Sequence, residues 1–275
     1  MRDPTVSVIV PTKNEEVNIV RCLTSVKKQT YKGKIEIIVV DNFSTDKTVH
    51  LAKKFTSKVW KRGSERSAQR NFGAEHARGD YLLFLDADME LSRGAIADCV
   101  KLAQLPHSVI VTITERGRGY DFWGRALALE KNTYYQGPTY LVSSRFFPRE
   151  PFLKLGGYDQ SLVAAEDWDL TQRFLNEGFV MRITRSSVYH HEPKATLITL
   201  IKKEMYYIKN IARYAKKHPL AFSYQGSILY RGFVWIRSWR TLIRHPLLTL
   251  GFLWYKLVVW IVWQWYTKTT RISQR

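Results

Sequence analysis

Residues 81–91 read YLLFLDADMEL, and this short stretch indicates both a fold and the position of a site. The uninterrupted apolar run Tyr81–Leu85 is typical of a strand that helices cover on both faces. It leads directly into Asp86-Ala87-Asp88. In open α/β sheets, ligands bind beyond the carboxyl ends of the strands, where paired carboxylates suit Mg²⁺ or Mn²⁺. The other interpretation is an aspartate pair that only caps a turn before Met89.

The segments around this strand predict an α/β fold. Val6–Val10, Ile35–Val40 and Val109–Thr114 are further β-branched runs. Helix-like stretches separate them, including Ser44–Lys54, and a helix from about Asp167 to Asn176 closes the pattern. This alternation predicts a mostly parallel sheet with helices on both faces.

Polar loops follow the first strands of the predicted sheet. They read PTKNEE at residues 11–16, DNFSTDKT at 41–48 and GSERSAQRNFG at 63–73. Three such loops at one sheet edge can surround a nucleotide, because carboxylates accept hydrogen bonds from base or ribose and arginine binds phosphate. For Asp41, followed by Ser44-Thr45-Asp46, the alternative is a helix cap.

The order of these segments resembles that of family 2 glycosyltransferases with the GT-A fold. The matching pieces are VSVIVPTKNEE, IEIIVVDNFSTDKT, RSAQRNFGAEHARGDYLLFLDADMEL and FLKLGGYDQSLVAAEDWDLTQRFLNEG. They cover most of residues 6–178 in the family's order. The resemblance implies an inverting transfer of a sugar from a nucleotide-sugar donor.

The resemblance also implies roles for individual residues on the donor side. It assigns Pro11, Asn14 and Glu15 to the first nucleotide-binding loop, Asp41 to the base, Arg70 and Asn71 to the ribose and phosphate, and Asp86 and Asp88 to the DxD motif. In that motif the second aspartate, Asp88, is the main metal ligand. The metal, Mg²⁺ or Mn²⁺, offsets charge that develops on the leaving diphosphate.

On the acceptor side, Glu166-Asp167 matches the acidic pair that supplies the catalytic base in the family, usually the aspartate. Inversion requires a carboxylate to take the acceptor proton on the face opposite the leaving group. Asp169 is a second candidate, and Asn42 departs from the family pattern, which often has an acid there. The alternative for the acidic pair is a helix N-terminus, where the dipole favours acids.

Other segments are candidate parts of the site. One of His190 and His191 is expected to complete the metal or diphosphate site, as in some family members; the alternative is a satisfied histidine pair at a domain edge. Gly156-Gly157-Tyr158 resembles the turn that shapes the acceptor side. The aromatic and basic stretch Arg116–Tyr135 is expected to form an acceptor wall or lid.

Composition excludes several classes of protein. The 275 residues are 45% hydrophobic and 24% charged, which excludes disorder. Two cysteines, Cys22 and Cys99, are too few for a disulfide framework. The N-terminus has no long apolar stretch typical of a signal peptide, so we expect the chain to lie at the cytoplasmic face of a membrane.

The membrane expectation comes from the distribution of charge. Residues 205–275 contain 12 Lys and Arg, no Asp or Glu, and six of the nine tryptophans. Basic residues with tryptophan beside aliphatic runs are typical of a bilayer surface. A nucleic-acid-binding tail would be more polar between its basic residues, so no nucleic-acid partner is expected.

Three helices are expected in this basic region. Ala195–Lys217 and Ser227–Arg244 have amphipathic patterns, and Leu247–Tyr266 is long enough to cross a bilayer. Ten Leu, Ile, Val and Phe residues favour insertion of the last segment by about 3–6 kcal/mol, while Lys256 opposes it by about 3. This near balance predicts a helix in the membrane plane or partly inserted. The predicted domains are residues 1–194, catalytic, and 195–275, membrane-associating.

Together these observations predict an inverting, metal-assisted glycosyltransferase. Its expected donor is a UDP-, GDP- or dTDP-sugar, and its acceptor a polyprenyl-phosphate lipid or lipid-linked glycan. One alternative is a metal-dependent nucleotidyltransferase, which would typically have a glycine-rich first loop that residues 11–16 lack. Another is a non-catalytic membrane adaptor of GT-A fold, but the acidic residues of the site are all present.

Overall fold

A computed structural model describes residues 3–135, 140–192 and 194–272. The chain forms two compact units. The first comprises Met1–Arg116 and Val142–His191, and the second Gly117–Leu141 and Glu192–Arg275. The second unit therefore includes a segment, 117–141, that the sequence analysis assigned to the catalytic domain.

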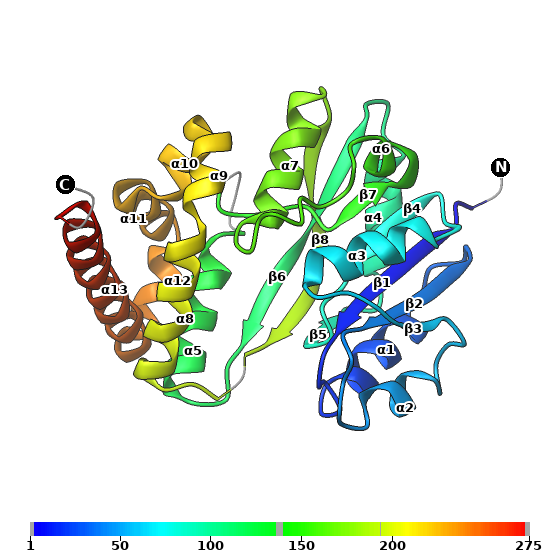
Figure 1. The fold of residues 1–275 in the computed structure, drawn as a ribbon, viewed down its shortest axis with the longest axis horizontal. Coiled ribbons are helices and arrows are strands. Elements are labelled where there is room, and N and C mark those ends of the chain that lie inside the picture. The colour runs from blue at the N-terminus through cyan, green and yellow to red at the C-terminus, as the bar shows by residue number, and fades with distance from the viewer. Residues whose placement is uncertain (1–2, 136–139, 193, 273–275) are drawn as a thin grey trace. The chain divides into compact units, whose positions relative to one another are not determined.

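One sheet organises the first unit (Figure 1). Within the described residues it has eight strands in the order β3-β2-β1-β4-β7-β6-β8-β5. They are β1 (Val6–Thr12), β2 (Ile35–Asp41), β3 (Val59–Lys61), β4 (Tyr81–Phe84), β5 (Met89–Leu91), β6 (Val109–Arg118), β7 (Phe146–Pro148) and β8 (Val180–His191).

The sheet is parallel in one half and contains antiparallel pairs in the other. β1 pairs in parallel with β2 and β4, and β2 with β3, which confirms the expected arrangement of the early strands. β7 is antiparallel to both β4 and β6, and β5 is antiparallel to β8. The parallel register brings Thr12 opposite Asp41, so the loops after β1 and β2 start at the same edge.

Helices and alternating side chains create a separate core on each face of this sheet. The helices of the first unit are α1 (Ile19–Lys27), α2 (Thr48–Ala52), α3 (Arg66–Glu75), α4 (Ala95–Ala103), α6 (Arg149–Lys154) and α7 (Glu166–Asn176). Val8 and Val10 of β1 join one core with residues of α1 and α4. Ile9, which points the other way, joins the second core with residues of α3, α6 and α7.

The predicted helix Ser44–Lys54 is shorter than expected. α2 begins only at Thr48, because the residues before it form hydrogen-bonded turns. Ser44 N–H donates to Asp41 Oδ2 at 2.9 Å, and Thr48 N–H donates to Asp46 Oδ1 at 3.0 Å. The N-cap of α2 is Lys47, without a side-chain capping hydrogen bond, so Asp41 does not cap this helix and instead accepts from Ser44 in the turn before it.

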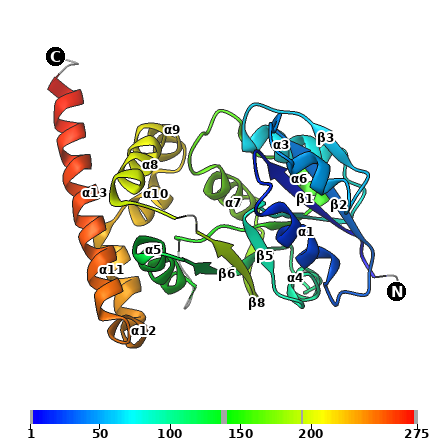
Figure 2. The same ribbon diagram turned by 90° about the horizontal axis from the view of Figure 1, so that it is seen from below.

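Apart from the end of β6, the regular secondary structure in the described residues of the second unit is helical (Figures 1 and 2). Its helices are α5 (Phe122–Thr133), α8 (Leu197–Asn210), α9 (Ala212–Lys217), α10 (Pro219–Gln225), α11 (Ile228–Arg237), α12 (Trp239–Ile243) and α13 (Pro246–Ile272). The predicted helix 195–217 is thus two helices, and 227–244 is also divided, at Ser238. Residues 246–265 of α13 are long and apolar enough to cross a membrane.

Candidate active site

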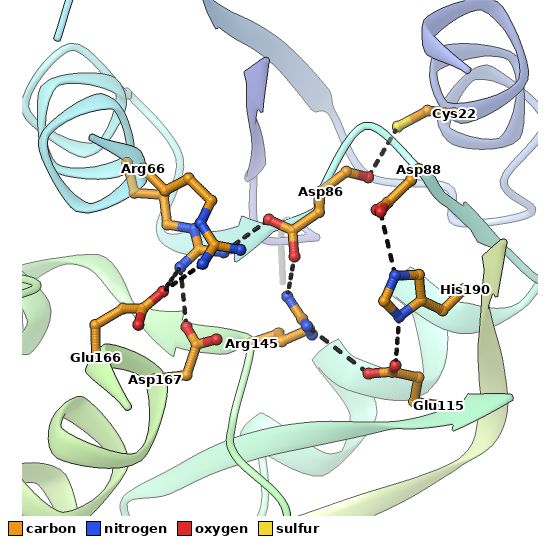
Figure 3. Close-up of polar contacts among 10 residues, drawn as sticks. Cys22, Arg66, Asp86, Asp88, Glu115, Arg145, Glu166, Asp167 and His190 are labelled. Atoms are coloured by element: carbon orange, nitrogen blue, oxygen red, sulfur yellow. Dashed lines mark hydrogen bonds and ion pairs between the residues drawn. The ribbon is translucent and has the colours of Figure 1, made fainter. Parts of the chain in front are cut away.

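The candidate site lies at the end of β4, where the sequence analysis placed it (Figure 3). Asp86 and Asp88 follow this strand directly. Side chains from α3, β8 and the residue before β7 contact them, and side chains from α7 and β6 contact those in turn. All of these residues belong to the first unit.

Arg70 of α3 joins the two acidic segments of the site. Its side chain is fully buried, and its Nη2 lies 2.7 Å from Asp86 Oδ1. Its Nη1 lies 3.0 Å from Asp167 Oδ1 and 3.4 Å from Glu166 Oε1. The structure therefore brings together Asp86 and Asp167, the residues that the sequence assigned to the donor and acceptor sides. The guanidinium of Arg70 lies over the face of the Tyr158 ring, with Cζ 5.0 Å from the ring centroid.

Asp86 is held by a second arginine that sequence reasoning missed. Arg145 Nη1 lies 3.0 Å from Asp86 Oδ2, so each carboxylate oxygen has its own guanidinium. Burial raises the pKa of Asp86, but the charges of Arg70, Arg145 and Arg66 outweigh burial and hold the pKa well below its usual range. Asp86 is consequently a carboxylate whose two oxygens are already engaged.

Asp88 is linked to a second chain of polar contacts. His190 of β8 places Nε2 3.1 Å from Asp88 Oδ2 and Nδ1 2.8 Å from Glu115 Oε1. Glu115 Oε2 in turn lies 3.7 Å from Arg145 Nη2. Glu115 and Arg145 therefore connect the neighbourhoods of the two aspartates. Neither residue stands in a motif: Glu115 lies in β6 and Arg145 directly precedes β7, two strands that pair antiparallel with each other, so the sequence carried no signal for them.

One oxygen of Asp88 fits a metal ligand. Asp88 Oδ1 is buried and has no hydrogen-bond partner in the described part of the chain. A buried carboxylate oxygen normally has a partner, and a hard divalent cation is a suitable one. The described residues contain no group of three or more His, Cys, Asp or Glu side chains that could hold an ion. Asp88 Oδ1 is the oxygen that this geometry leaves open to an ion, and His190 lies beside it with each ring nitrogen on a carboxylate.

The two histidines of the predicted pair separate. His190 contacts Asp88 and Glu115, whereas His191 Nε2 lies 3.0 Å from Glu90 Oε2. Successive side chains of a strand point to opposite faces, and β8 places the two histidines accordingly. Met89 pairs with His190 across the β5–β8 ladder.

The acidic pair opens α7. Ala165, the residue before it, has φ of 65°, a left-handed conformation that costs a non-glycine residue about 1 kcal/mol. Burial, reinforced by the Asp167 charge, raises the pKa of Glu166 against the opposing Arg70 and Arg66. The Asp167 side chain is more exposed, 25% against 8% for Glu166. Asp169, the second candidate for the base, is fully buried and pairs with Arg173, so it does not join this group.

The first two polar loops are joined to each other. Asn14 has φ of 54°, its N–H donates to Ser44 Oγ, and its Oδ1 accepts from the Thr45 N–H at 2.9 Å. Asp41 is fully buried and accepts hydrogen bonds from the Ser44 backbone and hydroxyl. These contacts hold the two predicted nucleotide-binding loops together.

Three other predicted residues have mainly local roles in these contacts. Pro11 is buried within β1. Glu15 accepts from Asn18 Nδ2 at 2.7 Å. Burial raises the pKa of Glu15, and the negative charges of Asp88 and Asp86 raise it further. The hydrogen bond from Asn18 lowers it, but by less. Asn71 exchanges two hydrogen bonds of 2.8 Å with the Tyr158 backbone, so it supports the turn beneath Arg70.

Comparisons with known proteins identify relatives of the chain. The family model described as Glycosyl transferase family 2 matches residues 7–155. Among curated proteins, the poly(ribitol-phosphate) beta-N-acetylglucosaminyltransferase TarS of Staphylococcus aureus is 32% identical over 119 residues, 40% of this chain. The match spans only 21% of TarS. A PGL/p-HBAD biosynthesis glycosyltransferase of Mycobacterium bovis is 28% identical over 194 residues, 66% of this chain and 74% of that protein.

Solved structures share the fold. Mannosyltransferase PcManGT from Pyrobaculum calidifontis, in complex with GDP-Man and Mn²⁺, matches 98% of this chain and 84% of its own with a TM-score of 0.62 and 23% identity. S. aureus TarS 1–349 in complex with UDP-GlcNAc matches 77% of this chain and 66% of its own with a TM-score of 0.55 and 21% identity. At these identities the likeness establishes the fold, and the predicted GT-A class is confirmed.

Proposed function

Because the chain belongs to glycosyl transferase family 2 and is a glycosyltransferase, we propose that it moves a sugar from a nucleotide-sugar donor to a membrane-linked acceptor with inversion. The observation that carries this proposal is the position of Arg70, whose guanidinium binds both Asp86 and Asp167. One buried cation thereby binds a carboxylate of the proposed donor side and a carboxylate of the proposed acceptor side.

On the donor side, Asp88 and His190 would hold Mg²⁺ or Mn²⁺, with Asp88 Oδ1 as the first ligand. Asp86, predicted as a ligand too, is engaged by Arg70 and Arg145, and we propose that it positions those arginines. The metal, when bound, offsets charge that develops on the leaving diphosphate. The nearby guanidiniums of Arg70 and Arg145 add fixed positive charge at the same side.

On the acceptor side, Asp167 is the proposed general base. It is the more exposed of the two acids, which allows it to reach an acceptor hydroxyl. The Arg70 hydrogen bond at 3.0 Å fixes the direction of its carboxylate. Glu166, more buried and with a raised pKa, positions Arg70 and Arg66 in this proposal.

The donor is proposed to bind over the joined loops, with Asn14, Glu15 and Asp41 toward the base and Arg70 and Asn71 toward the ribose and phosphate. Structural neighbours hold UDP-GlcNAc and GDP-Man with Mn²⁺, which supports a nucleotide-sugar donor with UDP or GDP, and we retain dTDP. A polyprenyl-phosphate lipid or lipid-linked glycan is proposed as acceptor, because the basic, tryptophan-rich residues 205–275 fit a bilayer surface.

In this proposal residues 1–194 carry catalysis and residues 195–275 carry membrane association at the cytoplasmic face. The segment 117–141, which includes most of the predicted acceptor wall, belongs to the second unit, so within residues 1–194 the proposed catalysis is carried by the first unit.

Nucleotide release tests this function. Detergent-purified protein is incubated with Mn²⁺ or Mg²⁺ and UDP-, GDP- and dTDP-sugars, with and without membrane lipid extract. We expect lipid-stimulated release from one donor, lost in Asp88→Ala and in Asp167→Asn. Glu75→Gln, which removes an exposed acid of α3, should keep full activity.

Three outcomes would contradict parts of this proposal. Release that survives Asp167→Asn would exclude this residue as the base. Full activity with a chelator present would exclude the metal. A chain that neither binds nor consumes any donor would instead be a non-catalytic adaptor of the same fold.

A further inference from the structure

Helix α13 has a docked face that packs inside the second unit. Phe252 and Tyr255 are almost fully buried, and the Phe252 ring centroid lies 5.4 Å from that of Trp235 in α11. Gly251 lies so close to α5 that an added Cβ would stand 2.7 Å from Phe122 Cζ. A side chain at 251 would therefore require the Phe122 ring to move.

The same face carries a charge that is paired within the unit. Lys256 Nζ lies 3.1 Å from Glu130 Oε2 of α5 and 3.8 Å from Glu204 Oε1 of α8. The adjacent Tyr255 hydroxyl donates to Glu204 Oε1 at 2.9 Å. The Glu130 side chain is 3% exposed, so removal of Lys256 would leave a buried carboxylate with less compensation.

Glu130 is the centre of a larger polar cluster. Its Oε1 accepts a hydrogen bond from the Tyr134 hydroxyl and lies 3.9 Å from Arg231 Nη1 of α11. Arg231 also donates to the Tyr134 hydroxyl at 2.8 Å. This cluster ties α5, α8, α11 and α13 together, and a buried network of this kind is stable only while its members stay paired.

The opposite side of α13 is apolar and exposed. Its outer face consists of Leu247, Leu250, Trp254, Leu257 and Ile261. Their spacing of three and four residues places them along one side of a helix, away from Phe252 and Tyr255. Each of the five is at least 46% exposed.

We propose that α13 remains docked on α5 through Lys256 and Glu130 and lies in the plane of an anionic bilayer leaflet, with its outer face among the lipids and without crossing. The inference rests on the membrane association proposed above and adds its geometry. The occupant is a lipid surface because residues 205–275 carry 12 basic and no acidic residues, which complements anionic headgroups. A crossing helix would have to take Lys256 from both of its carboxylates into hydrocarbon.

Flotation of the full chain with vesicles tests the surface. We expect about tenfold more bound protein with phosphatidylcholine–phosphatidylglycerol vesicles than with phosphatidylcholine alone, and loss of the difference at high salt. Leu257→Asp should lower binding severalfold. Leu105→Asp is the matched control, because Leu105 is an exposed leucine of the first unit, 40% exposed against 46%.

Thiol labelling tests the topology. His245→Cys and Ser273→Cys place single new thiols just before and just after α13 in the sequence, and the native Cys22 and Cys99 are buried. In sealed inside-out vesicles from a bacterial host, both new thiols should react with a membrane-impermeant maleimide before detergent is added.

Three results would overturn the inference: a Ser273→Cys or His245→Cys thiol that reacts only after detergent, protein that does not float with either vesicle, or equal loss of binding in Leu257→Asp and Leu105→Asp. The nucleotide-release assay in detergent is independent of all three. A chain that releases nucleotide but spans the membrane contradicts only this inference, whereas an in-plane chain without release contradicts only the proposed reaction.

Discussion

His190 and Glu115 form a hydrogen-bonded pair in the site, with His190 Nδ1 2.8 Å from Glu115 Oε1. Because the other ring nitrogen faces Asp88, Glu115 fixes the orientation of the imidazole at the proposed metal site. It also lies 3.7 Å from Arg145, which holds Asp86. Glu115 is thus a positioning residue for both aspartates.

The first prediction concerns this pair. Glu115→Gln should raise the Mn²⁺ concentration for half-maximal nucleotide release about 10–100-fold, because a positioned imidazole binds metal better. The melting temperature should stay close to that of the unsubstituted chain, so the effect is on metal binding and not on folding. Glu90→Gln is the matched control, since Glu90 pairs with His191 instead. Equal metal responses of the two variants would contradict the assigned role.

The second prediction concerns Arg70. Arg70→Lys should lower the free energy of unfolding by about 3–5 kcal/mol and reduce nucleotide release strongly, because one ammonium nitrogen cannot span Asp86 and Asp167 as the two Nη atoms of Arg70 do. Arg66→Lys is the control. The Arg66 side chain is half exposed, and its ion pair with Glu166 is longer, with Nη2 3.6 Å from Oε1. Its change should be at most about 1 kcal/mol. Urea unfolding and the release assay measure both effects.

The third prediction concerns pH. The unfolded Glu166 carboxyl ionises near its ordinary pKa of 4.5, whereas burial and Asp167 keep the folded carboxyl protonated to higher pH. Its favourable contribution is fully present below pH 4.5 and is lost as pH rises through the raised folded pKa. From pH 4.5 to neutral, Glu166→Gln should therefore lose less stability than the unsubstituted chain. Parallel urea-unfolding profiles for the two would contradict the shift.

The fourth prediction concerns the turn beneath Arg70. Gly156 and Gly157 both have positive φ, 77° and 65°. A Cβ at 156 would meet nothing within 4 Å, whereas one at 157 would stand 2.5 Å from Asn71 Oδ1. Gly156→Ala should cost about 1 kcal/mol, and Gly157→Ala clearly more, with weaker nucleotide release. Identical melting temperatures would show that the Asn71 contact does not matter.

The fifth prediction concerns the second unit. Glu130→Gln should lower the free energy of unfolding by about 3–5 kcal/mol, because it leaves Lys256 and Arg231 without their shared carboxylate. Lys256→Met should lower the free energy of unfolding by a smaller amount. The loss in the double variant should be about 0.5–3 kcal/mol smaller than the sum of the two single losses. Arg244→Gln, which removes an exposed charge just after α12, is the control with little effect. Strict additivity would show that the pair is not coupled.

The parts of the fold that could be predicted are those that depend on local patterns. β1, β2 and β4 are apolar runs followed by polar loops, so their parallel pairing and the position of Asp86 and Asp88 followed from sequence. Family membership and the GT-A fold are confirmed for the same reason, since the family's motifs lie in that order.

The rest depends on contacts between distant segments. Glu115 and Arg145 reach the site through β6 and the start of β7, and no local pattern distinguishes them from other charged residues. Lys256 looked like an interruption of a membrane span, yet it pairs with Glu130, far away in the sequence. The left-handed backbone of Ala165 is likewise invisible in a sequence where glycine is the usual sign of positive φ.

The β5–β8 ladder determines which histidine lies at the proposed metal site. β5 has three residues, and its pairing of Met89 with His190 decides which of two neighbouring histidines faces Asp88. A slip of one residue would turn every side chain of β8 to the opposite face, so His190 would leave Asp88 and the buried Val188 would leave the core. The packing of Val188 therefore also keeps His190, rather than His191, beside Asp88.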